Sequence, residues 1–210
     1  TMRGVKDIHN PRKAGLSMLG ERQKRWLFEG TKTSKADFIF VVSSVNFTIP
    51  HVAPNIPDKD EAWTVFLEER EELFALWDNL EQPVFLLTGD LHNSFAIQIT
   101  DNVWEFASGP YSSGNHSVIE EGGRPATGEF TYNGRTVDIL WSSYFLDDVP
   151  GKYQREKFYC VVQVNNVFNN PSQDQNPRWV AYPHPQVIFQ FYDGNTGMLE
   201  YAKSFPLTLD

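Results

Sequence analysis

Two short, continuous hydrophobic runs stand out in the first half of the chain, and both predict buried strands. Residues 84–87 are all apolar and lie between Pro83 and Gly89. Residues 38–45 are rich in the β-branched and aromatic residues that strands favour. Apolar runs of this length are typical of strands buried on both faces. We therefore expect both segments to be central strands of a sheet.

Between these runs, residues 61–80 repeat apolar positions with helical spacing. The apolar members are Trp63, Phe66, Leu67, Leu73, Phe74, Leu76, Trp77 and Leu80. The acidic residues between them predict a solvated face, with Glu69 and Arg70 in a local or interhelical ion pair. A strand–helix–strand connection is normally right-handed, so the two predicted strands should be parallel neighbours.

A second helix is predicted at residues 18–28, where Ser17 can cap its start and Gly30 can end it. We expect its apolar residues, Leu19, Trp26 and Leu27, to pack against the sheet. Its basic residues, Arg22, Lys24 and Arg25, should face water.

Beyond residue 95 the pattern changes to short strands. They are predicted at residues 95–99, 103–107, 136–140, 158–164, 179–181, 187–192 and 198–205. Asn133-Gly134 and Asp193-Gly194 are typical of hairpin turns, and residues 120–128 and 168–177 are predicted loops. The sequence thus predicts a layered α/β (α+β) fold whose mixed sheet has an antiparallel, β-rich end.

Length and charge limit the function classes. The 210 residues suffice for one domain with a sizeable core. A formal net charge of −9 argues against a general nucleic-acid or anionic-membrane binder, since both need a basic surface. The chain has no signal peptide pattern and no apolar run long enough to cross a bilayer.

An acid and a histidine follow the strand predicted at residues 84–87. Gly89 allows the chain to turn out of the strand, and Asp90 and His92 stand two positions apart. In an extended segment they would project together from the strand's carboxyl end, where open sheets bind ligands. A carboxylate oxygen and an imidazole nitrogen suit a transition or borderline metal ion. From spacing alone, a turn-capping Asp and a loop His remain the alternative.

Several stretches together resemble the PhoD-like alkaline phosphatase/phosphodiesterase family of calcineurin-like metallophosphoesterases. They are residues 17–27 (SMLGERQKRWL), 38–47 (FIFVVSSVNF), Trp63 with Glu69-Arg70, 84–94 (VFLLTGDLHNS) and 105–110 (EFASGP). These five matches occur in the family's order and extend over about half of the chain. The resemblance implies a metal-dependent phosphoric ester hydrolase with an αββα sandwich fold.

The resemblance also implies a site residue by residue. Asp90 and His92 correspond to metal ligands and catalytic residues of a two-metal site. Iron with calcium is the expected pair, and other divalent pairs are possible. The substrate would be a phosphate ester, and the compartment would be periplasmic or secreted.

The family's other metal motifs lie in an amino-terminal half that does not precede Asp90 here. Residues 1–210 are therefore predicted to be the carboxy-terminal half of the domain, completed by that half or by a second chain. Alone, they should be inactive and prone to aggregate.

Four further residues are candidate substrate contacts. Asn46 ends the strand at residues 38–45, where an Asn can also simply form a turn. His51 follows in a proline-rich loop. Asn115 and His116 belong to a G-N-H sequence, but the superfamily motif continues with Asp or Glu and this chain has Ser117. They remain candidates because the 105–110 segment lies near the site in the family.

Two alternatives to an enzyme stay open. A β-rich acidic chain could be a carbohydrate- or protein-binding module, although the two predicted helices argue against a plain sandwich. The fold could also be a phosphoesterase-like scaffold without catalysis. Cys160, the only cysteine, lies in a strand pattern and is expected to be a packed thiol.

Overall fold

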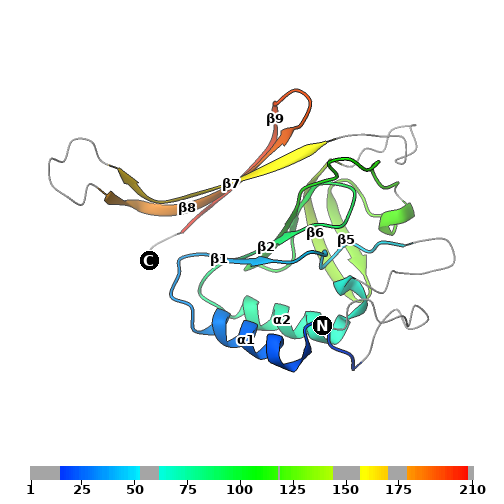
Figure 1. Ribbon diagram of the computed structural model, residues 1–210, viewed down its shortest axis with the longest axis horizontal. Helices are drawn as coiled ribbons and strands as arrows, with labels where there is room; N and C mark the ends of the chain where they lie inside the picture. The colour runs from blue at the N-terminus through cyan, green and yellow to red at the C-terminus, as the bar shows by residue number, and fades with distance from the viewer. Residues whose placement is uncertain (1–14, 53–61, 118, 144–156, 170–178, 208–210) are drawn as a thin grey trace. The chain divides into compact units, whose positions relative to one another are not determined.

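β1 (Ile39–Val42) and β2 (Val84–Thr88) lie side by side and run parallel in the computed structural model (Figure 1). This confirms the predicted parallel pair. The structure describes residues 15–52, 62–117, 119–143, 157–169 and 179–207. The chain divides into two compact units, Thr1–Lys157 and Phe158–Asp210.

Unit 1 contains a mixed six-stranded sheet in the order β1-β2-β4-β3-β6-β5. Its other strands are β3 (Phe95–Gln98), β4 (Val103–Ala107), β5 (Gly128–Tyr132) and β6 (Arg135–Ser142). β1, β2 and β4 are parallel, and the remaining pairs are antiparallel. Within the described residues β1 pairs only with β2, so the prediction of a central position for this strand is wrong for the described part of the chain.

Both helices lie on the same side of this sheet (Figure 1). α1 (Gly20–Lys32) runs through Gly30 instead of ending there. Its N-cap residue is Leu19 and not the predicted Ser17, although the Ser17 hydroxyl accepts a hydrogen bond from the Gly20 amide. The predicted helix at residues 61–80 is a short 3₁₀ turn, η1 (Trp63–Val65), followed by α2 (Leu67–Asp78). It makes the expected crossover between β1 and β2.

The core lies between the helices and one face of the sheet. Because side chains alternate along a strand, Val84 and Leu86 face the helices while Phe85 faces the other side. Phe85 is fully buried there among aromatic rings. Its ring neighbours are Phe38, Phe40, Trp104 and Phe106, with centroids 5.5–6.3 Å away. Both faces of the sheet are therefore apolar, as in a sandwich.

Two predictions about the helix surfaces are wrong. Glu69 and Arg70 are 3% and 1% exposed, because both satisfy backbone groups of neighbouring loops. Glu69 accepts from the amides of Met18 and Leu19, and Arg70 donates to the Phe47 carbonyl. Trp26, predicted to pack against the sheet, is 71% exposed.

The β-rich end is confirmed as antiparallel. β5, which the hydrophobic pattern did not predict, pairs with β6 across the Asn133-Gly134 turn. Unit 2 is a three-stranded antiparallel sheet in the order β7-β8-β9. Its strands are β7 (Phe158–Asn169), β8 (Trp179–Asp193) and β9 (Leu199–Pro206). β8 joins two segments that were predicted as separate strands, and most of the predicted 168–177 loop lies outside the described residues.

Candidate active site

The carboxyl ends of three parallel strands, β1, β2 and β4, meet at one edge of the six-stranded sheet. The loops that follow them are residues 43–49, 89–94 and 108–114. A Cβ atom placed on Gly89 would lie 3.8 Å from the Ser44 carbonyl oxygen, and one on Gly109 would lie 3.6 Å from the Leu91 carbonyl oxygen. The loops therefore lie against one another at the edge where open parallel sheets bind ligands.

Asp90 is exposed at this edge. Its φ of 76° is in the left-handed region, which Asp tolerates better than most residues. Residues 90–93 form a bend, so the prediction of an extended segment is wrong. The alternation that would have pointed Asp90 and His92 the same way does not apply, although both residues follow the end of β2.

His92 is half-buried, and its ring has a fixed hydrogen-bond partner. Its Nδ1 lies 2.9 Å from the Gly114 carbonyl oxygen. Because a carbonyl can only accept, Nδ1 carries the proton and donates. In the neutral imidazole, Nε2 then carries a lone pair, which is the form of imidazole that ligates a metal ion.

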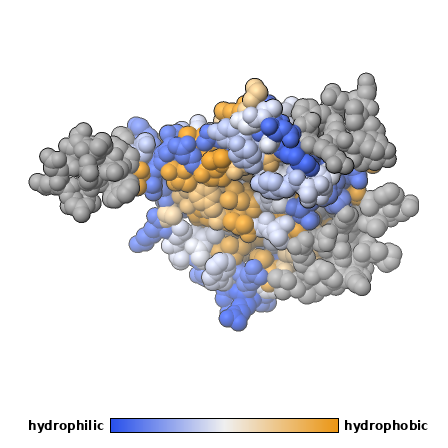
Figure 2. All heavy atoms as spheres, turned by 45° about the horizontal axis from the view of Figure 1, so that its top comes forward, coloured by the Kyte–Doolittle hydropathy of each residue, from blue (hydrophilic) through white to orange (hydrophobic). Residues whose placement is uncertain are grey.

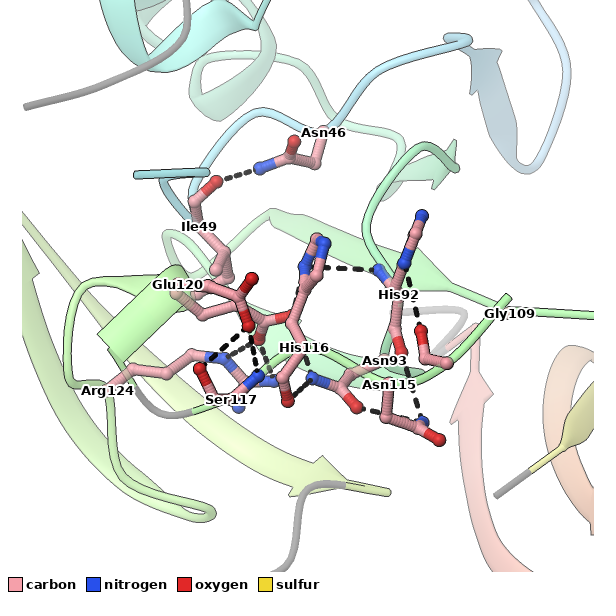
Figure 3. A network of polar contacts seen from close by, with 12 residues as sticks. Asn46, Ile49, His92, Asn93, Gly109, Asn115, His116, Ser117, Glu120 and Arg124 are labelled. Atoms are coloured by element: carbon pink, nitrogen blue, oxygen red, sulfur yellow. Dashed lines mark hydrogen bonds and ion pairs between the residues drawn. The ribbon is translucent and has the colours of Figure 1, made fainter. Parts of the chain in front are cut away.

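His116 lies beside His92, and His51 lies beside His116. The His116 ring stacks on the His92 ring, with centroids 4.3 Å apart and planes 15° from parallel. The His51 ring lies 4.3 Å from the His116 ring on a tilt of 43°. Figure 3 shows His92 and His116 side by side, with both rings directed toward the loop that carries Asn46 and Ile49. The structure thus brings together three residues that the sequence analysis named separately.

Asn115 is 3% exposed and holds the backbone of the loop after β2. Its side-chain amide donates to the His92 carbonyl and to the Asn93 side-chain oxygen, both at 3.0 Å. The amide nitrogen of Asn115 is therefore engaged in fixing the loop.

Asn46 lies in the loop after β1 and is fully buried. Its side-chain nitrogen donates to the Ile49 carbonyl (Figure 3), and its backbone carbonyl accepts from the Trp63 amide at 3.3 Å. Its Oδ1 has no hydrogen-bond partner among the described residues. Since a buried polar oxygen without a partner costs about 1–3 kcal/mol, this atom points to a donor or a cation supplied from elsewhere.

Sequence reasoning missed a fully buried ion pair beneath this loop. Arg124 donates from Nε to Glu121 Oε2 at 2.7 Å, and its terminal nitrogen lies 2.6 Å from the same oxygen. Glu121 Oε1 lies 2.8 Å from the Asn93 amide nitrogen and 3.2 Å from His116 Nδ1. Burial by itself would raise the pKa of Glu121, but Arg124 and the hydrogen bonds from His116 and Asn93 lower that pKa below its ordinary value. The i,i+3 spacing of Glu121 and Arg124 was the available signal.

Glu105 is a second buried acid that received no role from the sequence. It points from β4 into the loop after β1 and accepts from the Phe47 and Thr48 amides at 2.8 and 3.1 Å. The Thr48 and Thr88 hydroxyls lie 2.5 and 2.9 Å from its oxygens. Burial raises the pKa of Glu105, and these hydrogen bonds offset the rise only in part.

The donors at this edge suit a metal ion but do not complete a site. Asp90 and Asn46 offer oxygens and His92 offers a nitrogen, a mixture that borderline metals accept. Among the residues that the structure describes, no group of three or more His, Cys, Asp and Glu could hold a metal ion.

The family model for PhoD-like phosphatase matches residues 4–138. The chain belongs to the PhoD-like phosphatase family. The match includes all three loops of the edge and the Glu121–Arg124 pair, whereas β7, β8 and β9 lie beyond it. None of the curated proteins compared with the chain matches it. PhoD-like phosphatases are metal-dependent hydrolases, so the family agrees with the metal-suited donors that the edge presents.

Proposed function

We propose that this PhoD-like chain is part of a metal-dependent phosphoric ester hydrolase, in which Asp90 and His92 are metal ligands of a two-metal site. The observation that carries the proposal is the hydrogen bond from His92 Nδ1 to the Gly114 carbonyl, because it leaves Nε2 as a metal-binding lone pair at a ligand-binding edge.

Each ion would have a different ligand from this chain. The His92 nitrogen suits iron or another transition metal, whereas the Asp90 oxygen also suits calcium. When bound, the metals lower the pKa of a water molecule and stabilise charge on the phosphoryl oxygens. Asn46 Oδ1, which has no hydrogen-bond partner among the described residues, could bind one of these cations or a hydrogen-bond donor of the substrate.

The remaining candidate residues would surround the phosphate ester. His116 stacks on His92 and His51 lies against His116, and both histidines can donate hydrogen bonds to phosphate oxygens. Asn115 and the loop at residues 108–114 would shape the pocket by fixing the backbone that carries His92.

We also propose that another segment, an amino-terminal half or a second chain, completes this site against residues 1–210. β1 is an edge strand of the described sheet, and an apolar cavity of about 820 Å³ lies between it and α1. Trp26, Phe40 and Val42 are exposed at this cavity. Hydrophobic side chains are also visible among hydrophilic ones on the surface drawn in Figure 2. Exposed edges and apolar faces of this kind normally pair with another segment.

Two expectations about location and substrate accompany the proposal. A periplasmic or secreted location rests on the family resemblance, and among the described residues no helix is long and apolar enough to cross a membrane. The net charge of −9 gives no support for a nucleic-acid substrate surface.

The test is a His92→Ala variant of the full-length protein. Bound metal is measured by mass spectrometry, and hydrolysis is measured with p-nitrophenyl phosphate and bis-p-nitrophenyl phosphate. We expect His92→Ala to abolish turnover and to lower metal content, because a lost ligand costs more than the about 10–100-fold typical of a lost supporting residue.

His184→Ala is the matched control, since His184 is an exposed histidine on β8. It should retain wild-type metal content and activity. His116→Ala should lose much less than His92→Ala. A wild-type protein that carries metal but hydrolyses neither ester would favour a scaffold, and one that binds no metal at all would favour a binding module.

A further inference from the structure

The two carboxylate oxygens of Glu121 contact different groups of the protein. Oε2 pairs with Arg124, and both side chains are fully buried. Arg124 also donates to the Ser142 hydroxyl at 3.0 Å and to the Pro125 carbonyl at 3.3 Å. Its guanidinium is therefore held by the protein on several sides and serves to anchor Glu121.

The other oxygen, Oε1, faces the loop that carries His92. It accepts a hydrogen bond from the side-chain nitrogen of Asn93 at 2.8 Å, and Asn93 directly follows His92. His116 Nδ1 lies 3.2 Å from the same oxygen, and the His116 ring stacks on that of His92. One buried oxygen thus contacts both residues that support His92 (Figure 3 shows Asn93, His116 and Arg124 in this network).

A gain in folding stability does not by itself explain why the Glu121–Arg124 ion pair is buried. Two buried charges in an ion pair often contribute no more than well-packed apolar residues of the same volume. Here the pair lies beneath a loop without regular secondary structure, whose side chains need fixed acceptors. An ionised carboxylate holds these donors more strongly than a neutral group, because charge-assisted hydrogen bonds are roughly twice as strong as neutral ones.

We propose that Glu121 is a positioning residue for the metal loop at residues 89–94. It acts through Asn93 and His116, and Arg124 keeps its carboxylate in place. The inference rests on the proposed function, since it assigns Glu121 a role in setting the affinity of the metal that His92 binds.

The experiment measures Mn²⁺ binding to the full-length protein by isothermal titration calorimetry. Removing Glu121 alone would leave Arg124 buried without a partner, so both charges are removed together in Glu121→Leu/Arg124→Met. We expect this variant to fold, as judged by circular dichroism, and to bind Mn²⁺ about 10–100-fold more weakly than wild type.

A second variant, Glu121→Gln/Arg124→Met, restores an oxygen that can accept from Asn93. Its Mn²⁺ affinity should fall between those of wild type and Glu121→Leu/Arg124→Met, which a loss of packing alone would not produce. If Glu121→Leu/Arg124→Met does not fold, a lower Mn²⁺ affinity of Glu121→Gln/Arg124→Met than of wild type supports the positioning role of Glu121. Arg135→Met is the control, because Arg135 pairs with Glu71 on α2 and should change the thermal midpoint without changing Mn²⁺ affinity.

Two outcomes distinguish failure of the proposed function from failure of the positioning role of Glu121. A wild-type protein that binds no Mn²⁺ after chelator treatment and carries no metal as purified overturns both the proposed function and this inference. A wild-type protein that binds Mn²⁺, with the double variants binding equally well, overturns the positioning role of Glu121 alone and leaves the proposed function intact.

Discussion

Replacing Glu105 by glutamine should loosen the loop after β1 while leaving the sheet in place. Glu105 is fully buried on β4, and its two oxygens accept from four donors. Two of these donors are backbone amides, those of Phe47 and Thr48, which cannot reverse their roles. A glutamine presents one oxygen and one NH₂ group, so one of the two amides loses its acceptor.

The expected magnitude follows from that single lost partner. A buried donor left without an acceptor costs about 1–3 kcal/mol, and we expect Glu105→Gln to lower the free energy of unfolding by this amount. Glu105→Leu removes both acceptors and should cost more. The hydroxyls of Thr48 and Thr88 moderate the loss in the glutamine variant, because each can rotate to accept from the new NH₂ group.

Urea unfolding of the full-length protein measures the effect, and Glu129→Gln is the control. Glu129 is exposed on β5, so its replacement should change the free energy of unfolding by no more than about 0.5 kcal/mol. If Glu105→Gln were as stable as this control, the carboxylate would not be holding the loop and the reasoning would be refuted.

The difference in unfolding free energy between wild type and Glu105→Gln should also depend on pH, in a direction that the pKa of Glu105 sets. Burial raises the pKa of Glu105 above its ordinary value of 4.5, so the folded state binds the proton more tightly than the unfolded state does. The unfolded state then binds fewer protons between the two pKa values, and stability falls as pH rises through that window. The advantage of wild type over Glu105→Gln should therefore be largest at acidic pH and should shrink as pH rises.

Two other predictions test the remaining parts of the chain. Burial raises the pKa of the Cys160 thiol to about 12, so the native protein should react with a thiol reagent at mildly alkaline pH far more slowly than the urea-unfolded protein; equal rates would contradict a packed thiol. Residues 1–210 expressed alone should be inactive toward bis-p-nitrophenyl phosphate and should aggregate in light scattering, because β1 and its apolar cavity lack a covering segment in the described part of the chain; a soluble, monomeric and active chain would sink the proposal of a completing segment.

Hydrophobic pattern was enough to predict the order of the main elements. The runs at residues 38–45 and 84–87 became the parallel pair β1 and β2, because a continuous apolar run needs cover on both faces. The pattern missed β5 because its residues, GEFTY, contain only two aromatic positions among polar ones. β5 is instead specified by its turn with β6 and by the pairing of five residues across it.

The candidate site was predictable in its chemistry and less so in its geometry. The sequence named His92 and the residues around it as candidates, but the direction in which Asp90 points depends on a left-handed φ that an acid–x–histidine spacing does not specify. The stacking of His116 on His92 depends on a loop returning from beyond β4, and no local pattern encodes such a return. Both features are set by long-range contacts.

The buried acids share one physical cause that sequence periodicity cannot reveal. Glu69, Glu105 and Glu121 sit on or beside regular elements, and each accepts hydrogen bonds from an adjoining irregular segment. Regular strands and helices satisfy their own backbone groups, but loops packed against a sheet edge must find acceptors elsewhere. A carboxylate can accept several donors at once, so a single buried Glu can fix two or three loop groups together. The charged residues that a helical or strand pattern assigns to solvent are therefore the ones that these loops recruit as acceptors, and the positioning role proposed for Glu121 is one case of it.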